Sequence, residues 1–437
     1  MNNKQCCLNS IWSPNGGAQG VRLQDNYPDG NILWFNDFYL DEDRIIFSAG
    51  NFNGLYEYFI SEKKLNFLGN FKDENLFGKQ LYGKVHQYKD KLVFTPLSAE
   101  NIAVYDMKSK TFASVPLPIP KNSCGFECKF TNSIIYGNQF FLFPGYVSYI
   151  VEYDLEKDRL IVHDDWYDAY IRMWGKESDF LFGFDMVAIQ NAVYLASIQH
   201  SGLFKYYLDE NKYEFIEMPG KSGYVCTLSY DGKFFWCGMD DGKLLKVDCS
   251  GKVIQELDTL TAYGLEKGRT DLFVSSIFEG GWLWLFLSQE STVLKINCNN
   301  IEEDFEIIRY SDKERQYTNF EYHTVNGVVK KNGLSLFFVR SDRTTKCIMD
   351  GGIKHFLAAV SDSTGWSEKT IEGMLFYDEY EKYEKRRNNY FHKDLGVVLI
   401  EETPFTETLD YLINNSGVLN QNGNGLDNRG KIIYENC

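Results

Sequence analysis

Aromatic and acidic side chains gather in one short segment of the chain. Trp166 and Trp174 lie close in sequence to Asp164, Asp165 and Asp168, with two tyrosines between the tryptophans. Flat apolar rings beside carboxylate acceptors suit the binding of a sugar or a basic peptide. A long connection also needs aromatic side chains that anchor it to a core. The segment is therefore a candidate binding site, with packing as the alternative.

Carboxylates in pairs can act as general acid and general base. Asp240 and Asp241 are adjacent in sequence and, with Asp185, are the candidates for such a pair. Paired acids in polar loops are more commonly solvated, so catalysis is the alternative interpretation here. The sequence contains neither a glycine loop that cradles phosphate nor a Gly-x-Ser-x-Gly elbow, and therefore offers no support for a nucleotide-dependent enzyme or a serine hydrolase.

The six histidines form no short metal-ligand motif. His200 is the histidine that we consider for a binding site, whereas His86 is expected on an innermost strand, either facing a channel or buried with a partner. Cys124 and Cys128 have the spacing of half a zinc site, but no second pair of ligands with suitable spacing lies nearby. We therefore expect neither a metal nor a cofactor.

Two independent markers show that the chain is built from repeats. A short turn between two apolar runs begins near positions 42, 89, 137, 191, 231, 279 and 332. An alternating strand, usually followed by an acid, ends near positions 58, 105, 153, 206, 247, 296 and 348. Turn residues and strand residues are selected by different local physics, so their shared spacing of 40 to 54 residues indicates a real sevenfold repeat.

Each repeat is expected to hold four short antiparallel strands. In the second repeat we place them at 82–88, 91–96, 101–106 and 111–116. Four strands per repeat, with no helical periodicity between them, predict an all-β fold, a seven-bladed β-propeller. We expect an N-terminal extension at residues 1–32 and the propeller at 33–361. Residues 362–437 are expected to form a small mixed α/β appendage that holds most of the helix.

One segment carries a family resemblance. Residues 102–118 contain Tyr105-Asp106, a polar turn, Phe112 and a connection with Pro116, and they resemble the second half of a kelch repeat. The diglycine of that family is absent after the second strand, where this chain has Thr95-Pro96. The resemblance implies the propeller architecture, which hosts both binding proteins and enzymes.

The order of strands within a blade sorts its connections onto two faces. The connections between first and second strands, and between third and fourth, share one face, and the remaining connections share the other. The second face has the longer and more polar connections, and long loops carry function more often than scaffold strands do. We therefore predict that ligands bind there, with Trp166 and Trp174 near the rim, through Asn51, Asn53, Glu100, Asn101, Tyr146, His200, Asp240, Asp241 and Arg343.

Two cysteines test the register of the fifth repeat. If Asp231-Gly232 forms a two-residue turn, Cys226 and Cys237 lie directly opposite each other. We expect them to remain thiols, because ten cysteines in 437 residues are too few for a disulfide scaffold and the reducing cytoplasm is the expected location.

Composition excludes several classes of function. The net charge of −16 repels phosphate backbones, so we expect no nucleic-acid partner, and a neutral or cationic ligand is favoured. No apolar run is long enough to cross a membrane, and the N-terminus lacks the features of a secretory signal. The leading interpretation is noncatalytic recognition of a protein, peptide or carbohydrate. The alternative is a carbohydrate-active propeller enzyme that uses loop carboxylates as general acid and base.

Overall fold

The computed structural model describes residues 31–362, except 34, 51, 76–77, 119–127, 176–179, 266–271, 289–290, 312–324, 340–343 and 359. The chain divides into two compact units, Met1–Thr364 and Gly365–Cys437, and all the described residues belong to the first. Residues 363–437 of the predicted C-terminal appendage lie outside the described residues, and so do residues 1–30 of the predicted N-terminal extension.

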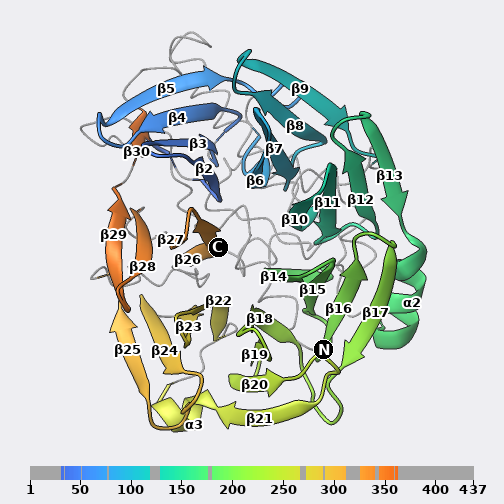
Figure 1. The fold of residues 1–437 in the computed structure, drawn as a ribbon, viewed down its shortest axis with the longest axis vertical. Coiled ribbons are helices and arrows are strands. Elements are labelled where there is room, and N and C mark those ends of the chain that lie inside the picture. Colours follow the sequence, from blue (N-terminus) through green and yellow to red (C-terminus); the bar gives the residue numbers. More distant parts are fainter. Residues whose placement is uncertain are drawn as a thin grey trace, which may run out of the picture. The chain divides into compact units, whose positions relative to one another are not determined.

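Seven sheets of four antiparallel strands surround a common axis (Figure 1), which confirms the predicted β-propeller and its seven blades. Within each sheet the strands follow one another in chain order, from the innermost to the outermost. The blades are β2 (Phe38–Leu40), β3 (Arg44–Ser48), β4 (Leu55–Phe59), β5 (Lys64–Gly69); β6 (Tyr82–Tyr88), β7 (Lys91–Pro96), β8 (Asn101–Asp106), β9 (Thr111–Pro116); β10 (Phe130–Tyr136), β11 (Gln139–Pro144), β12 (Ile150–Asp154), β13 (Arg159–His163); β14 (Phe182–Ile189), β15 (Ala192–Ser197), β16 (Gly202–Tyr207), β17 (Lys212–Glu217); β18 (Val225–Tyr230), β19 (Phe235–Met239), β20 (Lys243–Val247), β21 (Val253–Asp258); β22 (Phe273–Glu279), β23 (Trp282–Leu287), β24 (Thr292–Asn297), β25 (Phe305–Arg309); and β26 (Val325–Lys331), β27 (Leu334–Val339), β28 (Thr344–Met349), β29 (Gly352–Leu357).

The second strand of each blade is apolar on both faces because a neighbouring blade covers each face. In β7, Leu92 and Phe94 join the cluster that lies between blades 1 and 2, whereas Val93 joins the cluster between blades 2 and 3. All three side chains are at most 1% exposed. Side chains that alternate along a strand point to opposite faces. The core is therefore a series of clusters between blades, and each blade depends on its neighbours.

The ring closes through contacts between the first and last blades. Outside the blades, β1 (Asn31–Leu33) pairs antiparallel with β30 (Val360–Asp362). The rings of Phe35 and Phe338 pack with their centroids 5.5 Å apart. Segments from the two ends of the repeat array thus lie side by side and hold blade 7 against blade 1.

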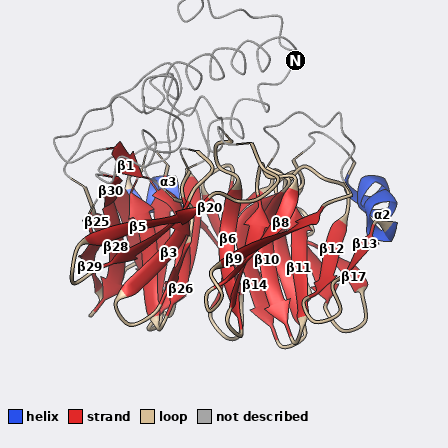
Figure 2. Ribbon diagram, turned by 90° about the horizontal axis from the view of Figure 1, so that it is seen from above, coloured by secondary structure: helices blue, strands red, loops and turns tan. Residues whose placement is uncertain are grey.

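The two faces of the ring differ as predicted (Figure 2). We call the face that holds the first-to-second and third-to-fourth connections of each blade the turn face. Its first-to-second turns are tight, and at Gly280 and Gly281 both residues of a two-residue turn have positive φ, 59° and 86°, as a type I′ turn requires. We call the opposite face, which holds the second-to-third connections and the connections between blades, the loop face.

In the described part of the chain, two helices interrupt the connections between blades, so the prediction that these connections contain no helix is wrong. Helix α2 (Asp165–Trp174) follows blade 3, and helix α3 (Thr259–Tyr263) follows blade 5. The sequence around α2 places Trp166, Tyr170 and Trp174 four residues apart, and all three are buried on one side of the helix. This is the spacing of an amphipathic helix, and in the sequence it is as clear as the alternation that predicts the strands.

The predicted pairing of Cys226 with Cys237 is also wrong. The carboxylate of Asp231 accepts hydrogen bonds from the amides of Lys233 (2.8 Å) and Phe234 (2.7 Å), which closes a longer turn than the two-residue one. Cys237 therefore pairs with Leu228, and Cys226 falls where the register shifts between residues 225 and 227. Side-chain bonding by an aspartate to its own turn thus moves the register by two residues.

Candidate functional site

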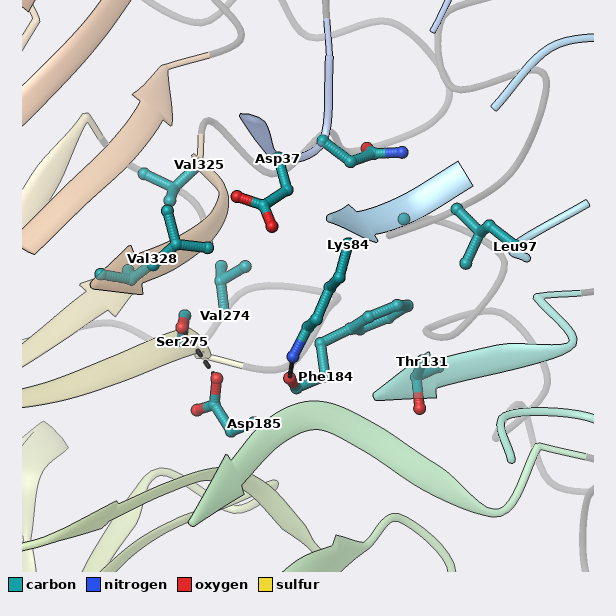
Figure 3. A pocket seen from close by; sticks show the side chains of 13 residues that line it. Asp37, Lys84, Leu97, Thr131, Phe184, Asp185, Val274, Ser275, Val325 and Val328 are labelled. Carbon is teal, nitrogen blue, oxygen red and sulfur yellow. Dashed lines mark hydrogen bonds between the residues drawn. The ribbon is translucent and has the colours of Figure 1, made fainter. Parts of the chain in front are cut away.

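A cavity of about 50 Å³ lies where the innermost strands converge (Figure 3). This volume is enough for several water molecules. Most of its lining comes from the first residues of inner strands, which enter the ring from the loop face, and Leu97 comes from a loop-face connection. The cavity therefore lies toward the loop-face end of the channel. Its lining includes Asp37, Lys84, Asp185 and Ser275, together with the apolar side chains of Leu97, Phe184, Val274, Val325 and Val328.

Asp185, on β14, connects three blades. One carboxylate oxygen accepts hydrogen bonds from the amides of Leu228 on β18 (3.0 Å) and Ser276 on β22 (3.2 Å). The other oxygen accepts a bond of 2.9 Å from the hydroxyl of Ser275. Burial raises the pKa of Asp185 to about 6, against the opposing effect of these hydrogen bonds. The carboxylate is thus held by protein groups, and it takes up a proton at a higher pH than an ordinary aspartate does.

Asp37 likewise connects neighbouring blades, at the point where the ring closes. Its carboxylate accepts hydrogen bonds from the amides of Phe38 (2.8 Å) and Val85 (3.0 Å) and forms an ion pair of 3.2 Å with Lys331 on β26. The ammonium group of Lys331 also donates to the carbonyl of Val85. Blades 1, 2 and 7 therefore share one charged network, and both of its charges are paired.

Lys84, on β6, reaches across the channel (Figure 3). Its Nζ atom donates to Oδ1 of Asn132 at 2.8 Å and approaches the carbonyl oxygen of Phe184 at 3.5 Å. Burial lowers the pKa of Lys84, against the opposing effect of the nearby carboxylates of Asp37 and Asp185. Among the described residues, Lys84 has no ion-pair partner of its own.

His86 and Ser133 have the residue types of a catalytic pair but lie in a structural network. Nε2 of His86 is 2.7 Å from the hydroxyl of Ser133, which is 2% exposed and also contacts the hydroxyl of Thr95. Burial lowers the pKa of His86 to about 3, so the imidazole is neutral at physiological pH. Of the two expectations for His86, the structure agrees with the partnered imidazole, and the residue is only partly buried.

The tryptophans of the aromatic segment face the core. Trp166 is fully buried in the cluster between blades 3 and 4, and its indole nitrogen donates to the carbonyl of His163 at 3.0 Å. Trp174 is 7% exposed and stacks against His200, with ring centroids 5.6 Å apart. The structure thus brings Trp174 and His200 together but leaves little aromatic surface open to solvent.

Several other predicted site residues hold the loops in place. Asn53 is fully buried, and its side chain bonds to the backbone of Phe71 in both directions. Asn101 donates to the carboxylate of Glu74, which also accepts from the amide of Glu100. The side chain of Glu100 itself is exposed to solvent.

Tyr146 belongs to an apolar cluster near the cavity. Its ring lies 4.8 Å from that of Phe180, which in turn lies 5.9 Å from that of Phe184 in the cavity wall. Leu97 joins the same cluster. A predicted loop-face residue is therefore connected by side-chain packing to the channel.

Asp240 and Asp241 do not form an acid and base pair with Asp185. Asp240 accepts a hydrogen bond from the amide of Tyr224 (3.0 Å), and Asp241 pairs with Lys243 (3.1 Å). Both are only partly exposed. Each of the three carboxylates has its own partners, and Asp185 lies in the channel. Asn51 and Arg343, also predicted as site residues, lie outside the described residues.

Sequence reasoning missed Lys84, Asp37 and Lys331. A signal was available, because the innermost strand of a blade carries polar residues where the second strand is continuously apolar. The sequence Gly83-Lys84-Val85-His86 shows this contrast with the following strand. The sequence does not show that seven such strands converge on one axis, and this convergence brings the three side chains together.

The comparisons with known proteins support no transfer of function. No family model matches the chain, and no curated protein matches it. Similar solved structures include the computationally designed Ika8 protein, with 12% identity over 76% of this chain and 90% of that chain and a TM-score of 0.49. The WD40 repeats of RRP9 share 10% identity over 71% of this chain and 88% of that chain, with a TM-score of 0.48. BamB from Moraxella catarrhalis shares 10% sequence identity over 71% of this chain and 82% of that chain, with a TM-score of 0.46.

Two further observations concern the described residues. They contain no group of three or more histidine, cysteine, aspartate or glutamate side chains placed to hold a metal ion. Within the same part of the chain, no helix has the length and apolar character needed to span a membrane.

Proposed function

We propose that this protein is a noncatalytic recognition propeller that binds a protein or peptide on its loop face. The observation that carries the proposal is the difference between the two faces. The turn face is made of short hairpins, which leave little surface to shape a binding site, whereas the loop face holds the connections between blades and the cavity. A cytoplasmic location, with the cysteines as thiols, remains part of the proposal.

The side chains on the loop face favour a protein or peptide over a carbohydrate. A sugar site needs aromatic faces that are open to solvent, and both Trp166 and Trp174 are buried. Catalysis on a sugar would need a free carboxylate pair, and Asp240 and Asp241 are bound separately. The net charge of −16 favours a partner with a basic surface. The kelch-like residues of blade 2 are compatible with such a role.

The test begins with a partner. Purified full-length protein is immobilised, retained proteins are identified, and the affinity of each purified candidate is measured. The variants Glu100→Arg and His200→Ala change the loop face, whereas Lys233→Glu reverses an exposed charge in a turn-face hairpin and serves as the matched control.

We expect at least one loop-face variant to weaken binding by about tenfold or more, as the loss of a central contact does. The Lys233→Glu variant should change the affinity by less than about twofold. A large loss with Lys233→Glu, together with unchanged binding in both loop-face variants, would move the site to the turn face and refute the proposal.

A further inference from the structure

The ammonium group of Lys84 has unused hydrogen-bonding capacity inside the channel cavity. An ammonium group has three donors. Among the described residues, Lys84 uses one of them well, on Asn132 at 2.8 Å, and a second only at the limit of hydrogen bonding, on the carbonyl of Phe184 at 3.5 Å. At least one donor is left for a molecule in the cavity that Lys84 lines (Figure 3).

The other charged groups at the cavity are already bound. Asp185 accepts from two backbone amides and from a serine hydroxyl. Asp37 accepts from two amides and pairs with Lys331. A molecule that enters the cavity therefore meets two carboxylates that each already have three protein partners, and one cation that still has a donor to offer.

The remaining wall is mainly apolar, and its polar residues are Asn36, Thr131 and Ser275. Leu97, Phe184, Val274, Val325 and Val328 line the cavity, which has a volume of about 50 Å³. Such a wall favours a short hydrocarbon group, because burial of apolar surface is favourable. The cavity thus combines one cationic donor with a small aliphatic compartment.

We propose that this cavity binds a small aliphatic monocarboxylate, with its carboxylate on Nζ of Lys84 and its hydrocarbon chain against the valine side chains. A bond between an ammonium and a carboxylate is stronger than one to a neutral acceptor. A cation would meet an unpaired ammonium and carboxylates that are already bound. A phosphate would carry more negative charge toward Asp37 and Asp185 and would need more donors than Lys84 supplies.

The same chemistry could reach the cavity as a free acid or as the C-terminal carboxylate of a peptide, and we assign the free acid. This inference goes beyond the proposed function and does not depend on it. If the cavity binds no monocarboxylate, the proposal of protein recognition on the loop face still stands. If no protein partner is found, the proposal for the cavity still stands.

The test uses butyrate as the probe, in a buffer free of carboxylates. Binding to the full-length protein is measured by saturation-transfer NMR and titration calorimetry. Butyramide and butylamine are the neutral and cationic controls, and an N-acetylated tetrapeptide that ends in valine represents the peptide source. Lys84→Met replaces the cationic side chain with an uncharged one of similar length. Lys330→Met, which removes an exposed lysine paired with Glu279, is the matched control.

We expect butyrate to bind, butyramide and butylamine to bind at least about tenfold more weakly, and Lys84→Met to weaken butyrate by at least about tenfold. Lys330→Met should leave binding within about twofold of the wild type. If Lys84→Met fails to fold, contacts between the butyrate methyl group and valine methyl groups of the wild type, observed by NMR, provide the second measurement.

Three results would overturn the proposal: no butyrate binding to the wild type, stronger binding of butylamine, or full binding by folded Lys84→Met. Tighter binding of the tetrapeptide than of butyrate would overturn the assignment to a free acid and identify a peptide C-terminus as the source of the carboxylate.

Discussion

The carboxylate of Asp185 on β14 accepts a hydrogen bond of 3.0 Å from the backbone amide of Leu228 on β18. The same oxygen accepts from the amide of Ser276 on β22. One side chain therefore satisfies backbone donors on the inner strands of the next two blades, at a point where no hydrogen-bonded sheet connects them. Polar side chains thus add to the apolar clusters between blades in holding the inner strands together.

The stability of the protein should depend on pH through Asp185. Its folded-state pKa of about 6 is higher than the value of about 3.9 expected in an unfolded chain, so folding favours the protonated form. This contribution is fully present below the unfolded pKa and is lost as the pH rises through 6. We expect the loss to be about 2 to 3 kcal/mol between pH 4 and pH 7.

Asp185→Asn provides the control for this prediction. An asparagine can accept from Leu228 and Ser276 through its carbonyl and donate to Ser275 through its amide, so the variant should fold. The urea midpoint of the wild type, measured relative to that of Asp185→Asn, should fall between pH 4 and pH 7. Parallel pH profiles for the two proteins would show that Asp185 does not titrate in this range.

Trp166 should contribute to stability rather than to a binding surface. Its side chain is fully buried between blades 3 and 4, so Trp166→Ala should lower the free energy of unfolding by about 3 to 5 kcal/mol. Glu100→Ala, at an exposed position on the same face, should change it by less than about 0.5 kcal/mol. Thermal melting measures both, and an unchanged melting temperature in Trp166→Ala would contradict the buried position.

Lys295 should stabilise blade 6 mainly through aromatic rings. Its Nζ atom lies 4.3 Å from the ring centroid of Trp282 and 5.5 Å from that of Trp284, and it pairs with Glu306 at 3.0 Å. Lys295 is 6% exposed, so Lys295→Met should cost about 1 to 2 kcal/mol through the lost cation–π contacts.

Glu306→Gln removes only the ion pair of Lys295. The Glu306 side chain is 55% exposed, so this change should cost less than about 1 kcal/mol. Urea unfolding compares the two variants. An equal cost in both would mean that the ion pair, and not the aromatic rings, accounts for the contribution of Lys295.

Much of the fold could be predicted because each blade repeats the same local chemistry. The four strands predicted for blade 2 coincide with β6, β7, β8 and β9 at both ends. Turn residues and alternating apolar residues fix these elements locally. The register at Asp231 was not predictable from turn length alone, since it depends on which amides the carboxylate accepts.

The candidate site was less predictable than the fold. Loop residues such as Asn53 were selected for their polarity, but a polar side chain can bind the backbone of its own loop as readily as a ligand. Lys84 lies in a strand, and the polar residues of that strand do not by themselves show what its side chain contacts. Its role follows from Asn132 and Phe184, which are 48 and 100 residues away in the chain.

The most direct test of the recognition role is hydrogen–deuterium exchange of the protein with and without its purified partner. Binding on the loop face should slow exchange of backbone amides in the connections at residues 97–100 and 218–224. Exchange in the turn-face hairpins at 89–90 and 231–234 should remain unchanged. Slower exchange confined to these hairpins, with the loop-face connections unaffected, would contradict recognition by the loop face.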